Sequence, residues 1–312
     1  MDKIVIYQIF TRLFCNNKSE LAYNGTIESN GCGKLNSFDN HILETIRKQG
    51  VTHIWFTGVI AHASRTDYSN NGIPPSPPAT VKGNAGSPYA IRDYFDIDPD
   101  LAENVRCRMK EFTNLIERVH NNGMKFIMDF VPNHVARDYG KVDMTPGHPV
   151  LGAEDDRSVH WREENDFIYY PGEALRLPTE SPKGIEPYYE MPAMATGNNC
   201  YTPAPGINDW FETVKINYCD HHTATWDKMY DIIDFWASKG VDGFRCDMVE
   251  LVPPQFFKWL ISKVKEKYPH LIFIAEVYKK DLYRQYIREV GFDLLYDKSG
   301  LYDTLRAITD KS

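Results

Sequence analysis

The segment Gly240-Val-Asp-Gly-Phe-Arg-Cys-Asp-Met-Val-Glu250, with Leu271-Ile-Phe-Ile-Ala-Glu276 further on, decides the fold of this chain. Two short apolar runs each end in a carboxylate, Asp247 in the first and Glu276 in the second, with a helix-like stretch between them. In a barrel of parallel strands, residues at the carboxyl ends of the strands point into one catalytic mouth. Two carboxylates on neighbouring strands would therefore face one pocket, which suits cleavage of glycosidic bonds.

Strand-like and helix-like runs alternate on both sides of this segment. We predict strands at 4–10, 51–59, 125–131, 241–246, 271–275 and 292–296, the first of them buried, helices at 40–49, 103–122, 225–238, 254–268 and 281–289, and a long loop at 63–99. This alternation indicates βαβ units and a parallel sheet, either doubly wound or part of a (β/α)₈ TIM barrel. Carboxylates that end several strands, and the lack of a glycine-rich nucleotide motif after any strand, favour the barrel.

Regular periodicity disappears between 136 and 220, where Pro, Gly, Tyr and charged residues dominate. Structureless loops of this length are uncommon inside compact domains, so the stretch is interpreted as an inserted domain. We therefore expect residues 1–135 to form the first part of a catalytic barrel with strands 1–3. Residues 136–220 would form the insertion, and residues 221–312 would continue the barrel with strands 4–6.

Composition narrows the possible partners. The 312 residues carry a formal net charge of −8, which argues against nucleic acid or an anionic membrane as the main partner. Aromatic residues make up 13%, which suits a carbohydrate binder but equally a tyrosine-rich core. The chain opens with Met1-Asp2-Lys3 and enters a strand without a signal peptide, so a cytoplasmic location is expected.

The six cysteines are scattered and are expected to be free thiols. Cys219, His221 and His222 form a loose group without the spacing of a zinc motif, so no metal site is predicted there. His62, His221, His222 and Trp210 match no catalytic motif and are expected to pack in loops.

Arg245 and Asp247 are two residues apart, so they share one face of a strand. A guanidinium beside a carboxylate holds it ionised and oriented, as a nucleophile requires, although a purely structural ion pair would look the same. Glu276 follows the apolar Phe273-Ile-Ala275, and a carboxylic acid in such surroundings can stay neutral and protonate a leaving oxygen. Asp129-Phe-Val-Pro-Asn-His134 closes the third strand, and taken alone it could be ordinary turn chemistry.

Taken together, these motifs resemble the alpha-amylase family of glycoside hydrolases (family 13), nearest to neopullulanase-like and bacterial alpha-amylases. Asp129-Phe-Val-Pro-Asn-His134, Gly243-Phe-Arg-Cys-Asp247 and Phe273-Ile-Ala-Glu276 are similar to the family's first three conserved regions, and Val214-Lys-Ile-Asn217 to a further motif. The likeness implies that Asp247 is the nucleophile and Glu276 the general acid/base. It also implies a set of substrate-binding residues: Tyr89, Asp129, His134, Arg245 and Glu250.

The chain departs from the family pattern in several places. Typical alpha-amylases carry Lys at the position of Glu250, which leaves the bond specificity open. Asn133 stands where calcium-binding relatives have a metal ligand, so calcium is conceivable there, but Lys215 replaces an Asp of several of them and disfavours it. No Asn-His-Asp follows the sixth strand, although the family's third carboxylate comes from that motif. We therefore expect a barrel truncated after strand 6, with open edges through which copies could associate.

The sequence thus predicts a retaining glycosidase that acts on alpha-glucans such as starch or malto-oligosaccharides through a covalent glycosyl-enzyme. A first alternative is a non-catalytic sugar-binding or inactive chain that lacks the third catalytic Asp. A second is a metal-dependent barrel enzyme with Asp129, Asp247 and Glu276 as ligands. Arg245 counts against the second alternative, because a cation beside Asp247 competes with the metal.

Overall fold

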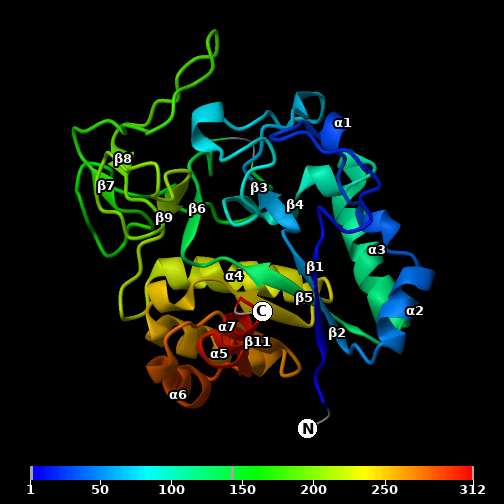
Figure 1. Cartoon of the computed structure of the whole chain (residues 1–312). Helices are drawn as coiled ribbons and strands as arrows, with labels where there is room; N and C mark the ends of the chain where they lie inside the picture. The colour runs from blue at the N-terminus through cyan, green and yellow to red at the C-terminus, as the bar shows by residue number, and fades with distance from the viewer. Residues whose placement is uncertain (1–2, 142–143, 311–312) are drawn as a thin grey trace.

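A single parallel sheet organises the fold. The computed structural model describes residues 3–141 and 144–310. The strands follow the order β1 (Ile6–Phe10), β2 (His53–Thr57), β5 (Lys125–Phe130), β10 (Gly243–Cys246), β11 (Ile272–Ala275) and β12 (Leu294–Leu295). The sheet is curled into a half-barrel (Figure 1), which confirms the predicted α/β architecture of six parallel strands in chain order.

Four long helices flank the sheet: α2 (Asn40–Lys48), α3 (Arg108–Asn121), α4 (Ala224–Ser238) and α5 (Pro254–Lys267). Alternate strand residues point toward them, so the rings of Phe56 and Phe126 stack at 4.5 Å between centroids. Phe112 of α3 packs edge-on against Phe126 at 5.3 Å and against Trp236 of α4 at 5.3 Å. These aromatic contacts join the outer helices to the sheet in one continuous core.

The other strand residues point to the concave face. Trp55, Ile127 and Ile274 form a small separate cluster there, on three different strands. Two residues further along, the same face presents Asp129 on β5 and Glu276 after β11. The carboxyl ends of the strands therefore carry polar side chains above an apolar layer, as in a TIM barrel.

Residues 63–99 are not the continuous loop that was predicted. They contain β4 (Ile91–Ile97), the longest strand, which pairs antiparallel with β3 (Ile60–His62). Its charged residues are buried with partners: Arg92 Nε lies 2.9 Å from Asp138 Oδ2, and Asp93 Oδ2 accepts from the Thr145 hydroxyl at 2.7 Å. This loop prediction was wrong because buried ion pairs hide the alternation of a strand.

The stretch that comprises residues 136–141 and 144–220 lies to one side of the sheet, at the upper left of Figure 1. Its short antiparallel pairs are β6 (His134–Ala136) with β9 (Thr213–Lys215) and β7 (Tyr169–Tyr170) with β8 (Ala193–Met194). The buried Arg137 guanidinium anchors it, with Nη1 2.8 Å from Glu190 Oε1. The boundaries of a separate inserted domain stay a prediction.

Two further predictions needed correction. The first strand is not buried: β1 lies at the edge of the sheet, and Ile9 is its one buried residue. The helix predicted at 281–289 is broken into a 3₁₀ turn (Lys280–Leu282), α6 (Tyr283–Gln285) and a π-helical turn (Tyr286–Val290). A π turn shifts the backbone bonding register, and regular sequence periodicity does not reveal it.

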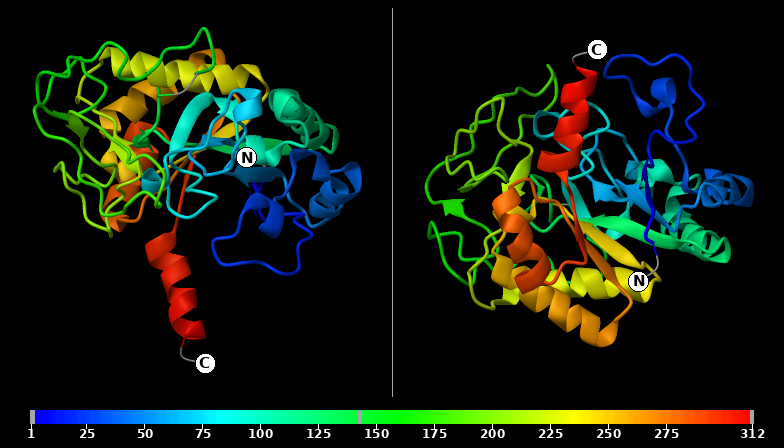
Figure 2. Two further views of the ribbon diagram at one scale, coloured as in Figure 1. Left: turned by 90° about the horizontal axis from the view of Figure 1, so that it is seen from above. Right: turned by 60° about the horizontal axis from the view of Figure 1, so that its bottom comes forward.

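The remaining helical elements are short. They are α1 (Ile27–Asn30), α7 (Asp303–Thr309), 3₁₀ turns at Leu35–Ser37, Ser69–Asn71, Pro78–Thr80, Pro99–Leu101, Val105–Cys107 and Val249–Leu251, and a π turn at Lys298–Tyr302. Figure 2 (left) shows α7 extending away from the rest of the molecule. Within the described ranges, none of the helices combines the length and hydropathy needed to cross a bilayer.

Candidate active site

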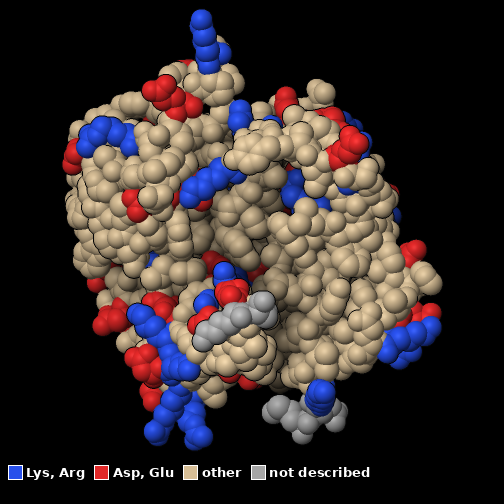
Figure 3. All heavy atoms as spheres, in the orientation of Figure 1, with Lys and Arg blue, Asp and Glu red and all other residues tan. Residues whose placement is uncertain are grey.

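A cavity of about 310 Å³ opens above the carboxyl ends of β10 and β11. Its lining combines residues from the sheet, from the segment before β4 and from the insertion: Lys82, Ser87, Tyr89, His134, Trp210, Glu212, Thr213, Arg245, Asp247, Met248 and Glu276. Figure 3 shows a hollow in the molecular surface, surrounded mainly by uncharged residues. Five of the seven residues predicted for the site therefore line this cavity; the exceptions are Asp129 and Glu250.

The Arg245 guanidinium is the centre of the site. Its Nη1 lies 2.6 Å from Asp247 Oδ1 and 3.4 Å from Asp129 Oδ1, and its Nη2 lies 2.5 Å from Glu276 Oε1. Its Nε donates to the Tyr296 hydroxyl at 3.0 Å. The parallel register places Arg245 beside Asp129 on β5 and Ile274 on β11, so one guanidinium reaches carboxylates at the carboxyl ends of three neighbouring strands.

Three buried carboxyl groups share this one cation. Burial raises the pKa of Asp247 to about 8; Arg245 opposes the rise without cancelling it, and Glu276 adds to it. Burial likewise raises the pKa of Asp129 to about 6, against the lowering effect of Arg245. The site therefore retains a proton near neutral pH, because one guanidinium cannot balance three anions away from water.

Backbone geometry fixes Glu276. Met248, directly after Asp247, has a left-handed conformation with φ 48°, and its N–H donates to Glu276 Oε2 at 2.8 Å. The Tyr278 hydroxyl donates to Glu276 Oε1 at 2.6 Å. A non-glycine residue with positive φ is costly and persists only where its surroundings determine it. Here the turn directs an N–H from the end of β10 to the carboxylate that follows β11.

His134 is held as a neutral imidazole. Burial, together with the nearby Lys215 ammonium, lowers the pKa of His134 to about 3. The Asn133 side-chain amide lies 3.0 Å from His134 Nδ1, which suits a tautomer with its proton on Nε2. The Trp210 ring lies 5.3 Å from the imidazole and lines the cavity, although its sequence context predicted loop packing.

The position where calcium was conceivable does not fit that metal. Lys215 Nζ donates to Asn133 Oδ1, the oxygen that a calcium ion would require, and to the Leu251 carbonyl at 2.8 Å. Asn133 Nδ2 donates to the Gly197 carbonyl at 2.7 Å. The buried ammonium thus joins the insertion to the loops after β5 and β10, in a place where a dication would be repelled.

Two predicted binding residues lie outside the cavity lining. Asp129 is buried beneath it, where it faces Arg245 and accepts from the Gly58 N–H at 3.4 Å. Glu250 Oε1 accepts from the N–H groups of Tyr278 and Lys279, at 2.6 and 2.8 Å. It therefore anchors the loop that carries the Tyr278 hydroxyl, and its contact with a substrate stays a prediction.

The family model described as "Alpha amylase, catalytic domain" matches residues 8–295 of the sequence. This chain belongs to the alpha-amylase family. The half-barrel and the carboxylates at the ends of β10 and β11 thus lie within the family's catalytic domain.

The proteins to which this chain is similar include enzymes and a transporter subunit. An alpha-1,4-glucan:maltose-1-phosphate maltosyltransferase of Cereibacter sphaeroides is 25% identical over 88% of this chain and 35% of its own length. An amino acid transporter heavy chain of Mus musculus is 27% identical over 53% of this chain and 21% of its own. Among solved structures, an alpha-amylase from Lactobacillus plantarum superposes with a TM-score of 0.59 and 22% identity, over 99% of this chain and 56% of that one.

The chain spans about a third of the first of these relatives and about half of the solved alpha-amylase. At 22% identity, the structural likeness shows the fold alone. The chain therefore has the alpha-amylase fold.

Several residues at the site could not be assigned a role from the sequence. Tyr278 and Tyr296 bind Glu276 and Arg245 through their hydroxyls, and Lys82 and Glu212 line the cavity as an ion pair of 2.9 Å. Tyr278 lies three residues after β11 and Tyr296 directly after β12, at the end of the predicted strand 292–296, so polar residues at or just beyond the ends of the predicted strands were the available signal.

Proposed function

We propose that the chain carries the catalytic machinery of a retaining glycosidase or glycosyltransferase acting on alpha-glucans. The observation that carries this proposal is the shared guanidinium: Arg245 binds both Asp247 and Glu276 at the floor of one cavity. Two carboxyl groups that flank one reacting bond are the requirement of glycoside hydrolysis. The alpha-1,4-glucan in the name of the maltosyltransferase relative supports the choice of substrate.

Asp247 is the nucleophile in this proposal. Because burial raises the pKa of Asp247 to about 8, the proton that the site retains first has to pass from Asp247 to Glu276. The Asp247 carboxylate then attacks the anomeric carbon while the Glu276 carboxyl protonates the departing glycosidic oxygen, which leaves a glycosyl ester on Asp247. Glu276 then removes a proton from water, or from the hydroxyl of another sugar, and that oxygen displaces Asp247. Both steps invert the anomeric centre, so the product keeps the α configuration of the substrate.

Three residues bind the sugar next to the cleaved bond. Tyr89 faces the Arg245 guanidinium at 5.4 Å and presents a ring on which a sugar can pack. The neutral His134 offers its Nε2–H to a hydroxyl. Trp210 continues the aromatic lining toward the insertion.

The test is hydrolysis of maltoheptaose by Asp247→Asn and Glu276→Gln variants. Removal of a general acid/base lowers kcat by about 10²–10⁴-fold, and removal of the nucleophile by at least as much. Glu266→Gln, an exposed change on α5, is the matched control and leaves the rate unchanged. Turnover by Asp247→Asn within tenfold of the parent rate contradicts the proposed nucleophile.

A non-catalytic glucan-binding role is the second candidate. The contacts of Glu276 favour it. Oε1 lies 2.5 Å from Arg245 Nη2 and accepts from the Tyr278 hydroxyl, and Oε2 accepts from the Met248 N–H at 2.8 Å, so both oxygens already accept from donors of the protein. Maltoheptaose binding measured by calorimetry, without detectable turnover by the unsubstituted chain, would select this role.

We also propose that copies of the chain associate. The edge strand β1 exposes Tyr7 and Phe10, and α7 with the preceding turn exposes Leu301, Leu305 and Ile308 at 53–62%. Unpaired strand edges and apolar helix faces promote pairing between chains. Light scattering coupled to size exclusion should show species larger than a monomer, and Leu305→Glu should reduce them.

A further inference from the structure

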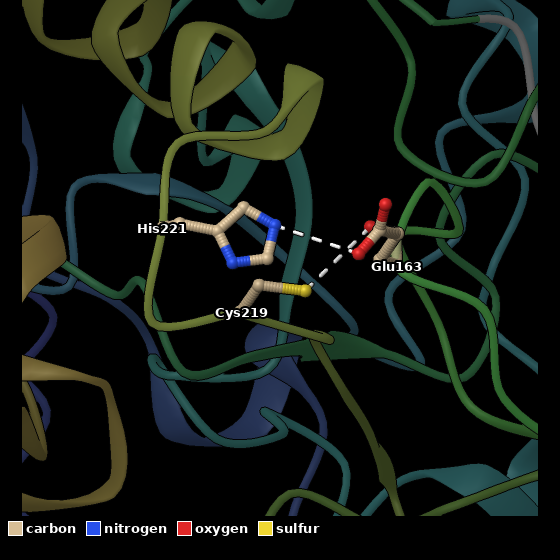
Figure 4. A group of neighbouring side chains, drawn as sticks. All are labelled: Glu163, Cys219 and His221. Carbon is tan, nitrogen blue, oxygen red and sulfur yellow. Dashed lines mark hydrogen bonds and ion pairs between the residues drawn. The ribbon is translucent and has the colours of Figure 1, made fainter.

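A second group of chemically distinctive side chains lies away from the catalytic cavity, where the insertion returns to the barrel. Cys219 and His221 lie in the segment between β9 and α4, and Glu163 lies earlier in the insertion. The Cys219 thiol, an imidazole nitrogen of His221 and a carboxylate oxygen of Glu163 all lie within 4.8 Å of one another. Figure 4 shows the Cys219 and His221 side chains directed toward Glu163.

Individual contacts show how the group is assembled. His221 Nε2 lies 3.5 Å from Glu163 Oε2, and Cys219 Sγ lies 3.9 Å from the Glu163 carbonyl oxygen. On the other side of the imidazole, Nδ1 lies 3.2 Å from Asp220 Oδ1. Metal-binding histidines commonly direct the second ring nitrogen to a carboxylate in this way, which fixes the ring orientation and strengthens the ligand.

The backbone around the group is fixed by buried Asn217. Its side-chain amide donates to the carbonyls of Arg162 and Asn165, both at 2.9 Å, and its oxygen accepts from Trp161 Nε1 at 3.0 Å. These three bonds hold segment 161–165 against the strand end that leads to Cys219. The donors are therefore brought together by the fold, and their meeting does not depend on the pairing of exposed side chains alone.

We propose that Glu163, Cys219 and His221 bind a zinc ion that joins the insertion to the start of α4. Thiolate, imidazole and carboxylate are the zinc ligands of proteins, whereas calcium and magnesium prefer oxygen ligands throughout. Zinc bonds of about 2.0–2.3 Å place tetrahedral donors roughly 3.5 Å apart. The His221 and Glu163 donors already have this separation, and all three donors lie within 4.8 Å of one another. The fourth position faces water, since His221 and Glu163 are 58% and 51% exposed.

Binding balances as a simple exchange. Zn²⁺ displaces the proton of the Cys219 thiol, which enters solution, and the neutral imidazole and the ionised Glu163 each contribute a lone pair. The Glu163 and Asp220 carboxylates, each within 3.5 Å of a His221 ring nitrogen, favour a dication among the donors.

The test is metal titration of the purified, metal-stripped chain. Calorimetry with Zn²⁺ should show one site with micromolar or tighter affinity, and Co²⁺ should produce a thiolate-to-cobalt charge-transfer band in the near ultraviolet. Cys219→Ser should abolish the band and weaken Zn²⁺ binding by at least 100-fold, and Glu163→Gln or His221→Gln should weaken it by at least tenfold. Asp220→Asn should weaken it by about 10–100-fold without loss of the band.

Two matched controls separate the site from nonspecific binding. Cys107→Ser removes an exposed thiol elsewhere on the chain, and His222→Gln removes the neighbouring imidazole, whose Nε2 lies 3.1 Å from Asp227 instead. Both should keep the parent affinity and the cobalt band. Zn²⁺ binding that is absent, or that is the same in Cys219→Ser as in the parent chain, overturns the proposal.

Discussion

Arg245 Nη2 lies 2.5 Å from Glu276 Oε1 while Nη1 of the same guanidinium lies 2.6 Å from Asp247 Oδ1. The planar fork therefore occupies both carboxylates of the proposed reaction at once. This geometry requires two donors in a fixed plane, which arginine has and lysine lacks. The pair also implies a step in the reaction: Glu276 has to exchange its bond with Arg245 for a proton before it can act as an acid.

The first prediction concerns this fork. Arg245→Lys keeps the positive charge but cannot bridge Asp247 and Glu276, so kcat/KM for maltoheptaose should fall by about 100-fold or more. Arg288→Lys, an exposed arginine beyond α6, is the matched control and should retain full activity. Comparable activity of Arg245→Lys and the parent would show that simple charge, and not the fork, matters.

The second prediction is a pH dependence of stability. Burial raises the pKa of Asp247 to about 8, so the folded chain binds more protons than the unfolded chain above the ordinary carboxyl pKa. The contribution of Asp247 to stability is therefore complete below about pH 4 and is lost as the pH rises toward 8. The melting temperature should fall between pH 5 and pH 7, and Asp247→Asn should flatten this fall.

The fall in melting temperature is expected only up to pH 7, because burial lowers the pKa of Lys215 to about 7. Above that pH, Lys215 gives a trend of the opposite sign, since the unfolded chain then binds the extra proton. In Asp247→Asn two opposite contributions remain below pH 6. Burial raises the pKa of Asp129 to about 6, which lowers stability as the pH rises, and burial lowers the pKa of His134 to about 3, which raises it, so the melting temperature of this variant should stay nearly constant between pH 4 and pH 6. A parent melting temperature that rises from pH 5 to pH 7 would contradict this assignment.

The strand arrangement of the site was largely predictable. A period of two places Arg245 and Asp247 on one face, and parallel neighbours bring Asp129 and Glu276 beside them. These relationships depend on local spacing and on the order of strands, both of which the sequence contains. The same reasoning failed for β4, because its buried charges depend on partners in distant loops such as Asp138 and Thr145.

The walls of the cavity were harder to predict. Trp210 reaches His134 because β6 pairs with β9 across about eighty residues of sequence, and no local pattern encodes that pairing. The N–H of Met248 donates to Glu276 because Met248 has a left-handed backbone conformation, and a methionine side chain gives no indication of that conformation. Tertiary pairing and backbone conformation, and not residue type, made these two residues part of the site.

The third prediction concerns Lys215, whose ammonium binds Asn133 Oδ1 at the position where calcium was conceivable. Lys215→Met removes the ammonium, which leaves the buried Asn133 Oδ1 without this donor at a cost of about 1–3 kcal/mol, and the partly buried Leu251 carbonyl without it at a smaller cost. The melting temperature should drop, whereas Lys258→Met, an exposed change on α5, should leave it nearly constant. Addition of CaCl₂ should stabilise neither the parent chain nor Lys258→Met. A clear calcium-dependent rise in the parent melting temperature would show that the Lys215 position does not exclude the metal.

The fourth prediction separates binding from chemistry in the cavity. Trp210 lines the wall formed by the insertion, and its ring lies 5.3 Å from the His134 ring; among the described residues, no hydrogen bond or ring contact joins it to Asp247 or Glu276. Trp210→Ala should therefore raise KM for maltoheptaose by about tenfold, the equivalent of one lost ring contact, while kcat changes little. Tyr23→Ala removes a fully exposed ring outside the cavity and should change neither constant. A loss confined to kcat would mean that Trp210 positions His134 for the reaction, and an unchanged KM would mean that the glucan does not pass along this wall.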